Sequence, residues 1–409
     1  MARRILPHRF IPAPVSMLLA VASLWAQQPV DPSHLSLSTI ASSVEVLKNA
    51  KDTVRIGRVL DTLFAYEDSR HSAVAGDTNV IFLYRGPARR VAVAGDFNGW
   101  SPSTDLLRAV GSPPRWFLVT TVPHGARFEY KFVVDSTMVL DPLNALQAMG
   151  GFGPNSEIRT SGYASPQEII RHDEIPQGTF DTVQMRSRAL GCTHPVYIYL
   201  PHGARRTGRT YCTLVVTDGG DFLSLGRMNV ILDNLIEQKR IPPVIALFVD
   251  PRSDPADPST NARMVEYAMN DRYVTFVADE LLPSLRRRYS LASSPDSVAI
   301  SGASMGGLIA TYAAFRRPDV FGASAAQSPS YWWSNDSMIT VMRESSRKPA
   351  RFYLDSGILH DAAKETRMMR SVLQEKGYAF SYAEYPEGHN WVNWRARVAS
   401  FLTYFWGLH

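Results

Sequence analysis

A serine between two glycines is the residue of this chain best suited to nucleophilic chemistry. The motif Gly302-Ala303-Ser304-Met305-Gly306 follows a β-branched run at residues 296–300 and precedes an Ala- and Leu-rich stretch at residues 307–314. A tight strand-to-helix turn raises a serine Oγ above a sheet, and flanking glycines give that turn room. The motif predicts a nucleophile elbow, with the Met305 N–H facing the oxyanion. The alternative is that the glycines only allow a strand and a helix to pack closely.

A serine nucleophile needs a base, and His389 is the histidine best placed to supply it. In this arrangement the base comes from a loop after the last strand. His389 lies in such a loop, at residues 386–391 near the C-terminus. The other histidines precede the catalytic region, flank an early strand, share the loop of the expected acid or end the chain.

Two carboxylates, Asp355 and Asp361, compete for the role of orienting acid. The acid is expected on the loop after the preceding strand, between serine and histidine in chain order. Asp355 is still at the strand end, whereas Asp361 follows the turn at Gly357 and can reach the histidine loop. We therefore favour Asp361, with Asp355 as the alternative and a serine–histidine dyad as a third arrangement.

The second oxyanion donor is expected on the loop after an earlier strand. Residues 217–222 contain two consecutive glycines, and glycine lets backbone N–H groups approach a substrate closely. Gly220 and Asp221 are the candidate donors. An ordinary Asp-Gly turn without a catalytic role is the alternative.

The composition is typical of a globular protein, and the sequence gives no indication of a nucleic-acid partner or a cofactor. The chain has 409 residues, 45% of them hydrophobic and 20% charged, which is enough for two or three domains. A net charge of +5, part of it in the N-terminal segment, gives no reason to expect a nucleic-acid partner. The sequence has no H-E-x-x-H motif, paired-cysteine motif, phosphate loop or dinucleotide fingerprint, so we expect neither a metal nor a cofactor.

The N-terminus has the features of a signal peptide. Arg3 and Arg4 precede an apolar stretch at residues 11–25, and small residues allow cleavage after Ala22 or Ala26. We assign residues 1–26 to this signal and expect an exported protein, periplasmic or secreted. A membrane anchor is the alternative, but prolines shorten the apolar run. No later segment is apolar enough to span a membrane, so no span is expected in the mature chain.

Cys192 and Cys212 are the only cysteines. An oxidising compartment would allow them to form a disulfide. Two separate thiols are the alternative, because the sequence does not give their distance.

The pattern of apolar residues changes along the chain and divides it into four parts. Residues 32–70 have helical periodicity and are expected to form a short helical segment without chemistry. Residues 75–158 contain short alternating strands separated by turns, which predicts an immunoglobulin-like β-sandwich. Residues 159–180 are predicted to be a linker. Residues 181–409 alternate strands and helices, which predicts an α/β sheet with helices on both faces.

The sandwich region resembles the glycogen-binding type of immunoglobulin-like domain. The resemblance rests on residues 94–100 (A-G-D-F-N-G-W), on Tyr130-Lys131-Phe132 and on Asp141-Pro142. It implies that Trp100 and Lys131 bind glycan. Met138 stands where sugar-binding members have a second aromatic, which favours a structural sandwich over glycan binding.

The C-terminal region resembles a family of esterases that includes enterochelin, feruloyl and acetylxylan esterases, esterase D and the mycolyltransferases. The matching motifs, which span about residues 180–409, are Asp218-Gly219-Gly220, Glu280-Leu281-Leu282-Pro283, the elbow at 302–307, Pro318-Asp319-Val320-Phe321-Gly322, Gln327-Ser328-Pro329-Ser330 and Gly388-His389. The resemblance implies an α/β-hydrolase domain that cleaves carboxylic esters. The preceding sandwich is most similar to the enterochelin esterase branch, although His360 stands where that branch often has Glu.

Aromatic residues near the catalytic loops could bind the acyl group of a substrate. Trp332, Trp333 and Trp391 are the candidates, and Trp394 is expected to face away from His389. Core packing explains them equally well. Arg263 is a candidate for binding an anionic substrate, although a pair with Glu266 one helical turn away is the simpler interpretation.

These features together predict an exported serine carboxylic-ester hydrolase similar to enterochelin esterases. Its substrate would be a small-molecule or glycan-linked ester, and the sequence leaves its oligomeric state open. The alternatives are a feruloyl or acetylxylan esterase and, from another class, a non-catalytic glycan-binding protein.

Overall fold

The computed structural model describes residues 35–204 and 209–408. The expected signal peptide at residues 1–26 lies outside the described residues. Within the described ranges, no helix is both long and apolar enough to cross a membrane.

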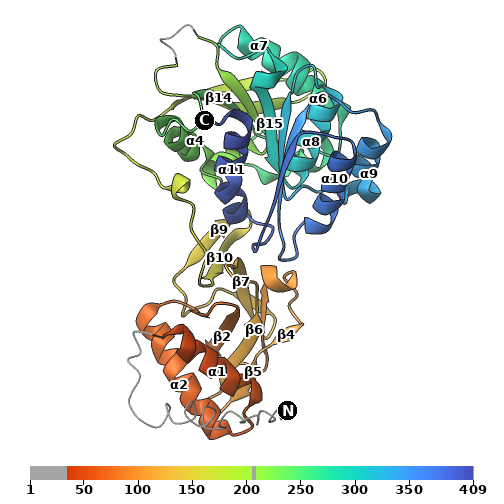
Figure 1. Ribbon diagram of the computed structural model, residues 1–409. Helices are drawn as coiled ribbons and strands as arrows, with labels where there is room; N and C mark the ends of the chain where they lie inside the picture. Colours follow the sequence, from red (N-terminus) through yellow and green to blue (C-terminus); the bar gives the residue numbers. More distant parts are fainter. Residues whose placement is uncertain (1–34, 205–208, 409) are drawn as a thin grey trace, which may run out of the picture.

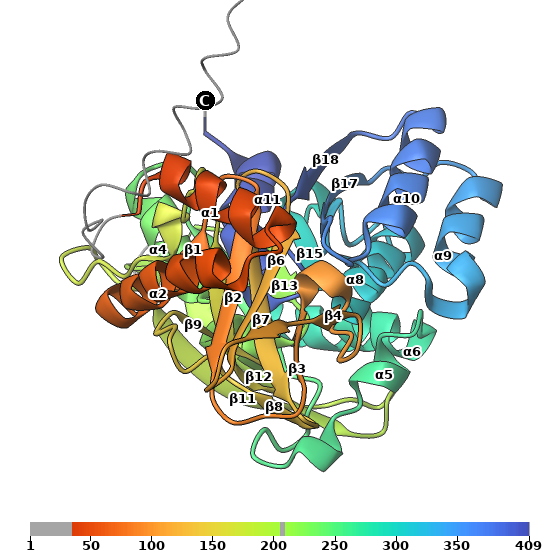
Figure 2. The same cartoon turned by 90° about the horizontal axis from the view of Figure 1, so that it is seen from below.

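Two helices, α1 (Leu37–Asn49) and α2 (Thr53–Arg70), cover one face of the sandwich. Side chains at the residues before them, Ser36 and Asp52, cap their N-termini. Figure 2 shows both helices lying across the first sheet of the sandwich. The buried side chains that join them to this sheet include Ile56, Leu60, Leu63, Ile81, Leu83 and Phe117.

The sandwich consists of two antiparallel sheets. The first contains, in spatial order, β1 (Val74–Ala75), β2 (Asn79–Arg85), β6 (Arg115–Thr121) and β5 (Arg108–Val110). The second contains β4 (Asp105–Leu106), β3 (Val91–Gly95), β7 (Arg127–Val134), β10 (Gly153–Arg159) and β9 (Gln147–Gly150), and β8 (Thr137–Val139) pairs with β7. Aromatic residues from both sheets, such as Phe82 and Tyr130, meet edge to face in the core between them.

The C-terminal region forms an eight-stranded sheet. Its spatial order is β11 (Thr179–Arg186), β12 (Thr193–Leu200), β14 (Val244–Val249), β13 (Cys212–Val216), β15 (Val298–Ala303), β16 (Ala323–Gln327), β17 (Arg351–Gly357) and β18 (Phe380–Tyr385). The pairs β11–β12 and β12–β14 are antiparallel, and the remaining neighbours are parallel. Every residue of β14 and β15 is buried, as expected of parallel strands covered on both faces.

Helices cover both faces of this sheet (Figure 1). On one face lie α3 (Gly219–Ser224), α4 (Met228–Glu237) and α11 (Trp391–Trp406). On the other lie α6 (Asp271–Thr275), a π-helical turn (Phe276–Leu281), α7 (Leu282–Arg286), α8 (Met305–Arg316), α9 (Trp333–Glu344) and α10 (Ala363–Glu375), with the short α5 (Arg263–Glu266) beside α8. The predicted fold class is confirmed: an α/β hydrolase preceded by a β-sandwich and a short helical segment.

The carboxyl ends of the parallel strands carry the loops that matter for chemistry. In a parallel sheet these ends share one edge, and ligands bind in the crevice outside it. The loops that follow β13, β15, β17 and β18 contain the predicted oxyanion, nucleophile, acid and base residues. Figure 1 shows the sandwich meeting the hydrolase region next to α11, which begins just after the base.

Candidate active site

Ser304 lies at a strained turn between β15 and α8. Its φ of 58° and ψ of −123° are unusual for a residue with a side chain. A Cβ at Gly302 would lie 2.1 Å from Thr217 Oγ1, and one at Gly306 would lie 2.4 Å from the same atom. Both glycines are therefore needed because Thr217, at the end of the neighbouring strand, packs against the turn. The N–H groups of Met305 and the next residues belong to the first turn of α8 and lack intrahelical acceptors.

Asp361 and His389 form a close pair. Asp361 Oδ1 is 2.6 Å from His389 Nδ1, and the Asp361 side chain is fully buried. Its Oδ2 accepts hydrogen bonds from Ser328 Oγ at 2.5 Å and from Gly357 N at 2.6 Å. Burial alone would raise the pKa of Asp361, but the contacts with His389 and Ser328 lower it below the usual value. The carboxylate is thus held ionised and oriented toward the imidazole.

Ser304 Oγ contacts a neighbouring serine rather than the imidazole. Its partner among the described residues is Ser330 Oγ, at 3.2 Å. Catalytic contacts are often loose without substrate and tighten in the complex, so this arrangement is compatible with a serine–histidine pair. Ser330 follows Ser328 in the loop after β16, and both touch expected triad residues. The sequence analysis included them only as part of a family motif and gave them no role.

Trp394 packs against His389, contrary to the expectation that it faces away. The two rings meet edge to face with centroids 5.0 Å apart. Trp394 Nε1 also donates to Ser328 Oγ at 3.1 Å, and Ser328 in turn contacts Asp361. The prediction was wrong because α11 begins at Trp391, so Trp394 lies on its first turn and its ring turns back toward the N-terminal end of the helix.

The other predicted aromatics occupy different environments. Trp391 packs edge to face against Phe222 at 5.1 Å and Trp394 at 4.9 Å. Trp333 packs against the main hydrolase core, whereas Trp332 is 52% exposed. Of the predicted candidates, Trp391 is therefore the one in contact with an aromatic neighbour of His389.

The segment after β13 (residues 217–222), called the oxyanion loop below, holds both candidate oxyanion donors, and one of them is already bonded within the segment. The Asp221 N–H donates to Asp218 O at 3.0 Å, which corrects its assignment as a donor to the substrate. The Gly220 N–H has no carbonyl acceptor among the described residues. A Cβ at Gly220 would lie 2.3 Å from Asp250 Oδ2, so a larger residue would displace this loop.

Arg263 links the oxyanion loop to the elbow. Its Nε donates to Asp218 Oδ1 at 2.8 Å, and its Nη2 donates to Ala303 O at 3.1 Å, directly before Ser304. These contacts use Nε and Nη2 of Arg263 within the protein, and its binding of an anionic substrate stays a prediction. The expected pair with Glu266 is also absent among the described residues, because Glu266 pairs with His194 at 3.0 Å.

The two cysteines are free, so the disulfide that the sequence allowed is not formed. Cys192 Sγ lies 3.3 Å from His194 Nε2 and 3.7 Å from Glu266 Oε1. These three side chains are the cluster of metal-ligating groups found in the described residues. The two nitrogens of His194 already contact Glu266 Oε1 and, at 2.9 Å, Asp250 O. The contact with Glu266 raises the pKa of His194 against the opposing effect of burial, so a buried ion pair accounts for the cluster.

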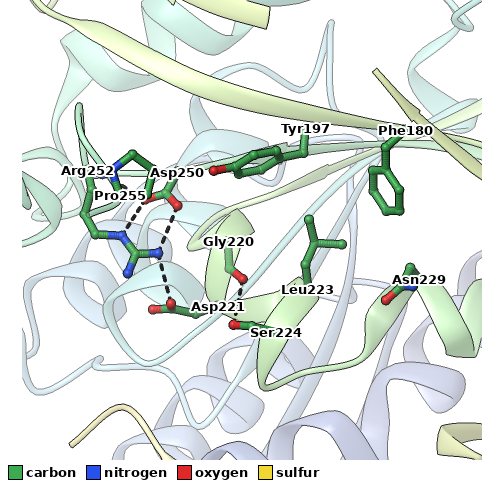
Figure 3. Close-up of a pocket in the computed structure, with 10 residues that line it drawn as sticks. All are labelled: Phe180, Tyr197, Gly220, Asp221, Leu223, Ser224, Asn229, Asp250, Arg252 and Pro255. Atoms are coloured by element: carbon green, nitrogen blue, oxygen red, sulfur yellow. Dashed lines mark hydrogen bonds and ion pairs between the residues drawn. The ribbon is translucent and has the colours of Figure 1, made fainter. Parts of the chain in front are cut away.

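A cavity of about 490 Å³ lies beside the oxyanion loop. Figure 3 shows the Arg252 guanidinium between Asp250 and Asp221, with Tyr197 and Phe180 on the strands above. Gly220 and Asp221 line the cavity, but Ser304 and His389 do not. The cavity is therefore bordered by the oxyanion loop without containing the nucleophile.

Trp100 and Lys131 lie on the same outer face of the sandwich. Trp100 packs against Ala94 and its neighbours, and Ala94 is the cross-strand partner of Lys131. The Trp100 indole N–H donates to the buried Asp96 Oδ1 at 3.0 Å. The polar edge of this ring is thus bound within the protein.

Asp355 is buried and has an unusual pKa. Burial, only partly opposed by Arg397 and Tyr353, raises its pKa to about 7, and the nearby Asp361 adds to the rise, whereas Gln327 opposes it. Because the folded protein binds this proton more tightly than the unfolded chain does, the protonated carboxyl contributes to stability. The contribution is complete below the ordinary pKa of aspartate and is lost as the pH rises toward 7.

The unfolding free energy of Asp355→Asn minus that of the parent protein is therefore expected to increase when the pH is raised from about 5 to about 8. The asparagine cannot ionise, so it avoids the cost of a buried charge at the higher pH. Urea unfolding of both proteins at the two pH values measures the difference. A difference in unfolding free energy that is the same at both values would contradict the assignment.

The strained serine turn, the mostly parallel sheet and the carboxylate-paired histidine are features of an α/β hydrolase. Residues 187–405 match the family described as "Putative esterase", and residues 78–150 match the "Glycogen recognition site of AMP-activated protein kinase". Because the first match covers more than half of the chain, this protein belongs to that esterase family. It is an esterase, a carboxylic ester hydrolase.

Individual relatives are distant. The chain is 26% identical over 199 residues to the uncharacterized protein YbbA of Bacillus subtilis (strain 168), covering 44% of this chain and 78% of YbbA. It is 23% identical over 277 residues to the iron(III) enterobactin esterase of Escherichia coli (strain K12), covering 66% of this chain and 67% of that enzyme. The solved ferric enterobactin esterase of Salmonella typhimurium has the same fold, with a TM-score of 0.69, 20% identity and coverage of 80% of this chain and 93% of that one.

Proposed function

We propose that this esterase uses Ser304, His389 and Asp361 as a catalytic triad. The observation that carries the proposal is the 2.6 Å contact between buried Asp361 Oδ1 and His389 Nδ1. This contact leaves Nε2 of the imidazole available as a base, while Ser304 lies at the strained turn typical of nucleophiles.

The reaction follows from this arrangement. His389 Nε2 accepts the Ser304 Oγ proton as Oγ attacks the ester carbonyl carbon. The N–H groups of Met305 and Gly220 stabilise the oxyanion of the tetrahedral intermediate. The imidazolium then protonates the departing alkoxide, leaving an acyl-enzyme. Water, deprotonated by the same histidine, releases the acid and restores Ser304.

The proposed substrate is a siderophore ester that carries catechol rings, such as enterobactin. The E. coli relative is named as an iron(III) enterobactin esterase, and its match covers 66% of this chain and 67% of that enzyme. Trp394 is buried against His389, and the partly exposed Trp391 packs on Trp394, so Trp391 is the ring of this pair that can stack on a substrate. A feruloyl or acetyl ester on a glycan is the second candidate, favoured by the glycogen-recognition match and by the shared face of Trp100 and Lys131.

Export completes the proposal. Arg3, Arg4 and the following apolar stretch support a signal peptide cleaved after Ala22 or Ala26, with the enzyme acting in the periplasm or outside the cell. N-terminal sequencing of the protein recovered from its producing cells tests this step. An N-terminus at residue 23 or 27 supports export, and retention of residues 1–26 contradicts it.

A turnover panel tests the substrate. Enterobactin, methyl ferulate, acetylated xylan and a simple acyl ester are compared by kcat/KM, with Ser304→Ala as the blank. We expect enterobactin to rank first. A preference for ferulate or acetylated xylan would contradict the siderophore assignment and support the glycan-linked alternative. Tight binding to glycogen, starch or xylan without turnover of any ester would support the non-catalytic alternative instead.

A further inference from the structure

The sandwich touches the loop that carries His389. The backbone N–H of Arg127, at the start of β7, donates to Pro386 O at 3.0 Å. Two residues further along, a Cβ at Gly388 would lie 2.2 Å from Asp96 Cγ, so the loop lies directly on this sandwich carboxylate. The histidine loop is thus packed between its own sheet and a second domain.

Asn390, the residue after His389, is the centre of this contact. Its Nδ2 donates to Asp96 Oδ2 at 2.8 Å, and its Oδ1 accepts from Arg127 Nη1 at 2.8 Å. The same Oδ1 caps α11 by accepting from Asn393 N at 3.1 Å. The sandwich therefore binds both the nitrogen and the oxygen of the Asn390 side-chain amide. Asn390 is the residue next to His389, the proposed base.

The sandwich side chains in this contact are themselves firmly held. The Arg127 guanidinium is fully buried and pairs with Glu129 at 3.0 Å and Glu157 at 2.6 Å. Asp96 is buried and also accepts from Glu129 N at 2.8 Å and from Trp100 Nε1 at 3.0 Å. Both oxygens of Asp96 and both Nη atoms of Arg127 are bonded, although the buried Arg127 Nε has no partner among the described residues. Buried bonds of this kind restrict the geometry, because a displacement leaves further polar groups unpaired.

The acid loop contacts the sandwich as well. Leu359, two residues before Asp361, is buried in the sandwich core cluster that contains Phe128. His360 lies against Gly99, where a Cβ would be 3.3 Å from its Nδ1. The Leu359 N–H also donates to Glu387 O at 3.1 Å, which joins the acid loop to the histidine loop. The sandwich thus contacts both loops that carry the Asp361–His389 pair.

We propose that Asp96 and Arg127 of the sandwich are positioning residues for catalysis, holding His389 in place through Asn390. This inference rests on the proposed triad and adds a role for the N-terminal domain within it. The turn at residues 94–100 resembles a glycan-binding turn. In this protein its Asp96 carboxylate accepts from Asn390 in the His389 loop, and the indole N–H of Trp100 orients that carboxylate.

The test is Asp96→Asn, with Asp233→Asn as a matched control. Asp233 is a buried aspartate that also accepts from a side chain, Tyr199 Oη at 2.6 Å, and from a backbone N–H, Gly178 N at 2.8 Å. Asp96 Oδ2 accepts from Asn390 Nδ2 and Glu129 N, and Oδ1 accepts from Trp100 Nε1. An asparagine has a single acceptor oxygen, so at least one of these donors loses its partner and the side chain that holds Asn390 is displaced. The control makes the same change away from the catalytic loops.

We expect Asp96→Asn to lower kcat on a p-nitrophenyl ester by about 10- to 100-fold, with KM nearly unchanged, because small misplacements of a catalytic group cost up to about 10²-fold. The control should keep kcat within about threefold while its thermal midpoint falls comparably. The exchange Asp96→Asn with Asn390→Asp restores a donor–acceptor pair and should recover most of kcat. A purely structural contact would not produce this recovery.

Equal kcat in Asp96→Asn and the Asp233→Asn control overturns the proposal, as does a KM change without a kcat change. If Asp96→Asn does not fold, Arg127→Lys replaces it, since lysine keeps the buried charge but lacks the second nitrogen that reaches Asn390.

Ser304→Ala is measured alongside, to separate a failure of the triad from a failure of the positioning role. An active Ser304→Ala contradicts the triad itself, whereas an inactive Ser304→Ala with an unaffected Asp96→Asn contradicts only the positioning role.

Discussion

Ser304→Ala is expected to lower kcat toward every ester on the order of 10⁶-fold, with the protein still folded. The reason is that covalent catalysis through Oγ has no substitute in the site, so the remaining rate comes only from binding and oxyanion stabilisation. Removing the side chain also relieves no packing constraint, because the turn is held by Gly302, Gly306 and Thr217. Hydrolysis of a p-nitrophenyl ester, with circular dichroism to verify folding, measures the effect.

Ser330→Ala is the matched control for this prediction. Its Oγ is 3.2 Å from Ser304 Oγ and is the nearest chemically equivalent group that could act instead. We expect the control to retain most of its activity, because Ser330 has no strained turn and no contact with His389 in the described structure. If Ser330→Ala were as inactive as Ser304→Ala, loss of activity would not identify Ser304 rather than Ser330 as the nucleophile.

Asp361→Asn is expected to lower kcat on the order of 10⁴-fold. Asparagine is neutral, so it cannot stabilise the imidazolium as the carboxylate at 2.6 Å does, and its NH2 group facing Nδ1 would select the wrong tautomer of His389. Steady-state kinetics at neutral pH measures the loss. The fold should survive, since an asparagine oxygen can still accept from Gly357 N or Ser328 Oγ.

Asp355→Asn separates this role from burial of a carboxyl group. Asp355 contacts Gln327 Nε2 at 3.5 Å and has no contact with His389 among the described residues. Its turnover should therefore stay close to that of the parent protein. Loss of turnover in Asp355→Asn together with retained turnover in Asp361→Asn would exchange the two assignments.

Much of the site follows from local sequence, because its chemistry depends on features that local sequence encodes. The elbow needs two glycines around Ser304 between a buried strand and a helix, and this pattern is visible without the fold. In this fold the nucleophile, the acid and the base follow one another in the chain, and this order indicates the loops on which Asp361 and His389 are expected. The predicted α/β sheet and sandwich follow from periodicities of the apolar residues.

Contacts between segments distant in sequence could not be predicted in this way. The Asp221 N–H is used within its own loop because α3 begins at Gly219, and helix boundaries are poorly encoded locally. Arg263 bridges Asp218 and Ala303 only because three loops meet at the sheet edge. The contact of Asp96 with Asn390 depends on how two domains pack, and no sequence pattern reports it.

Covalent labelling tests the central claim, that Ser304 is the nucleophile of a Ser–His–Asp esterase, most directly. The purified protein is reacted with a fluorophosphonate, digested, and the modified peptide is identified by mass spectrometry. We predict a single adduct on Ser304, strongly reduced labelling in His389→Ala, and none in Ser304→Ala. An adduct on Ser330 or another residue, or undiminished labelling of Ser304→Ala, would contradict the account.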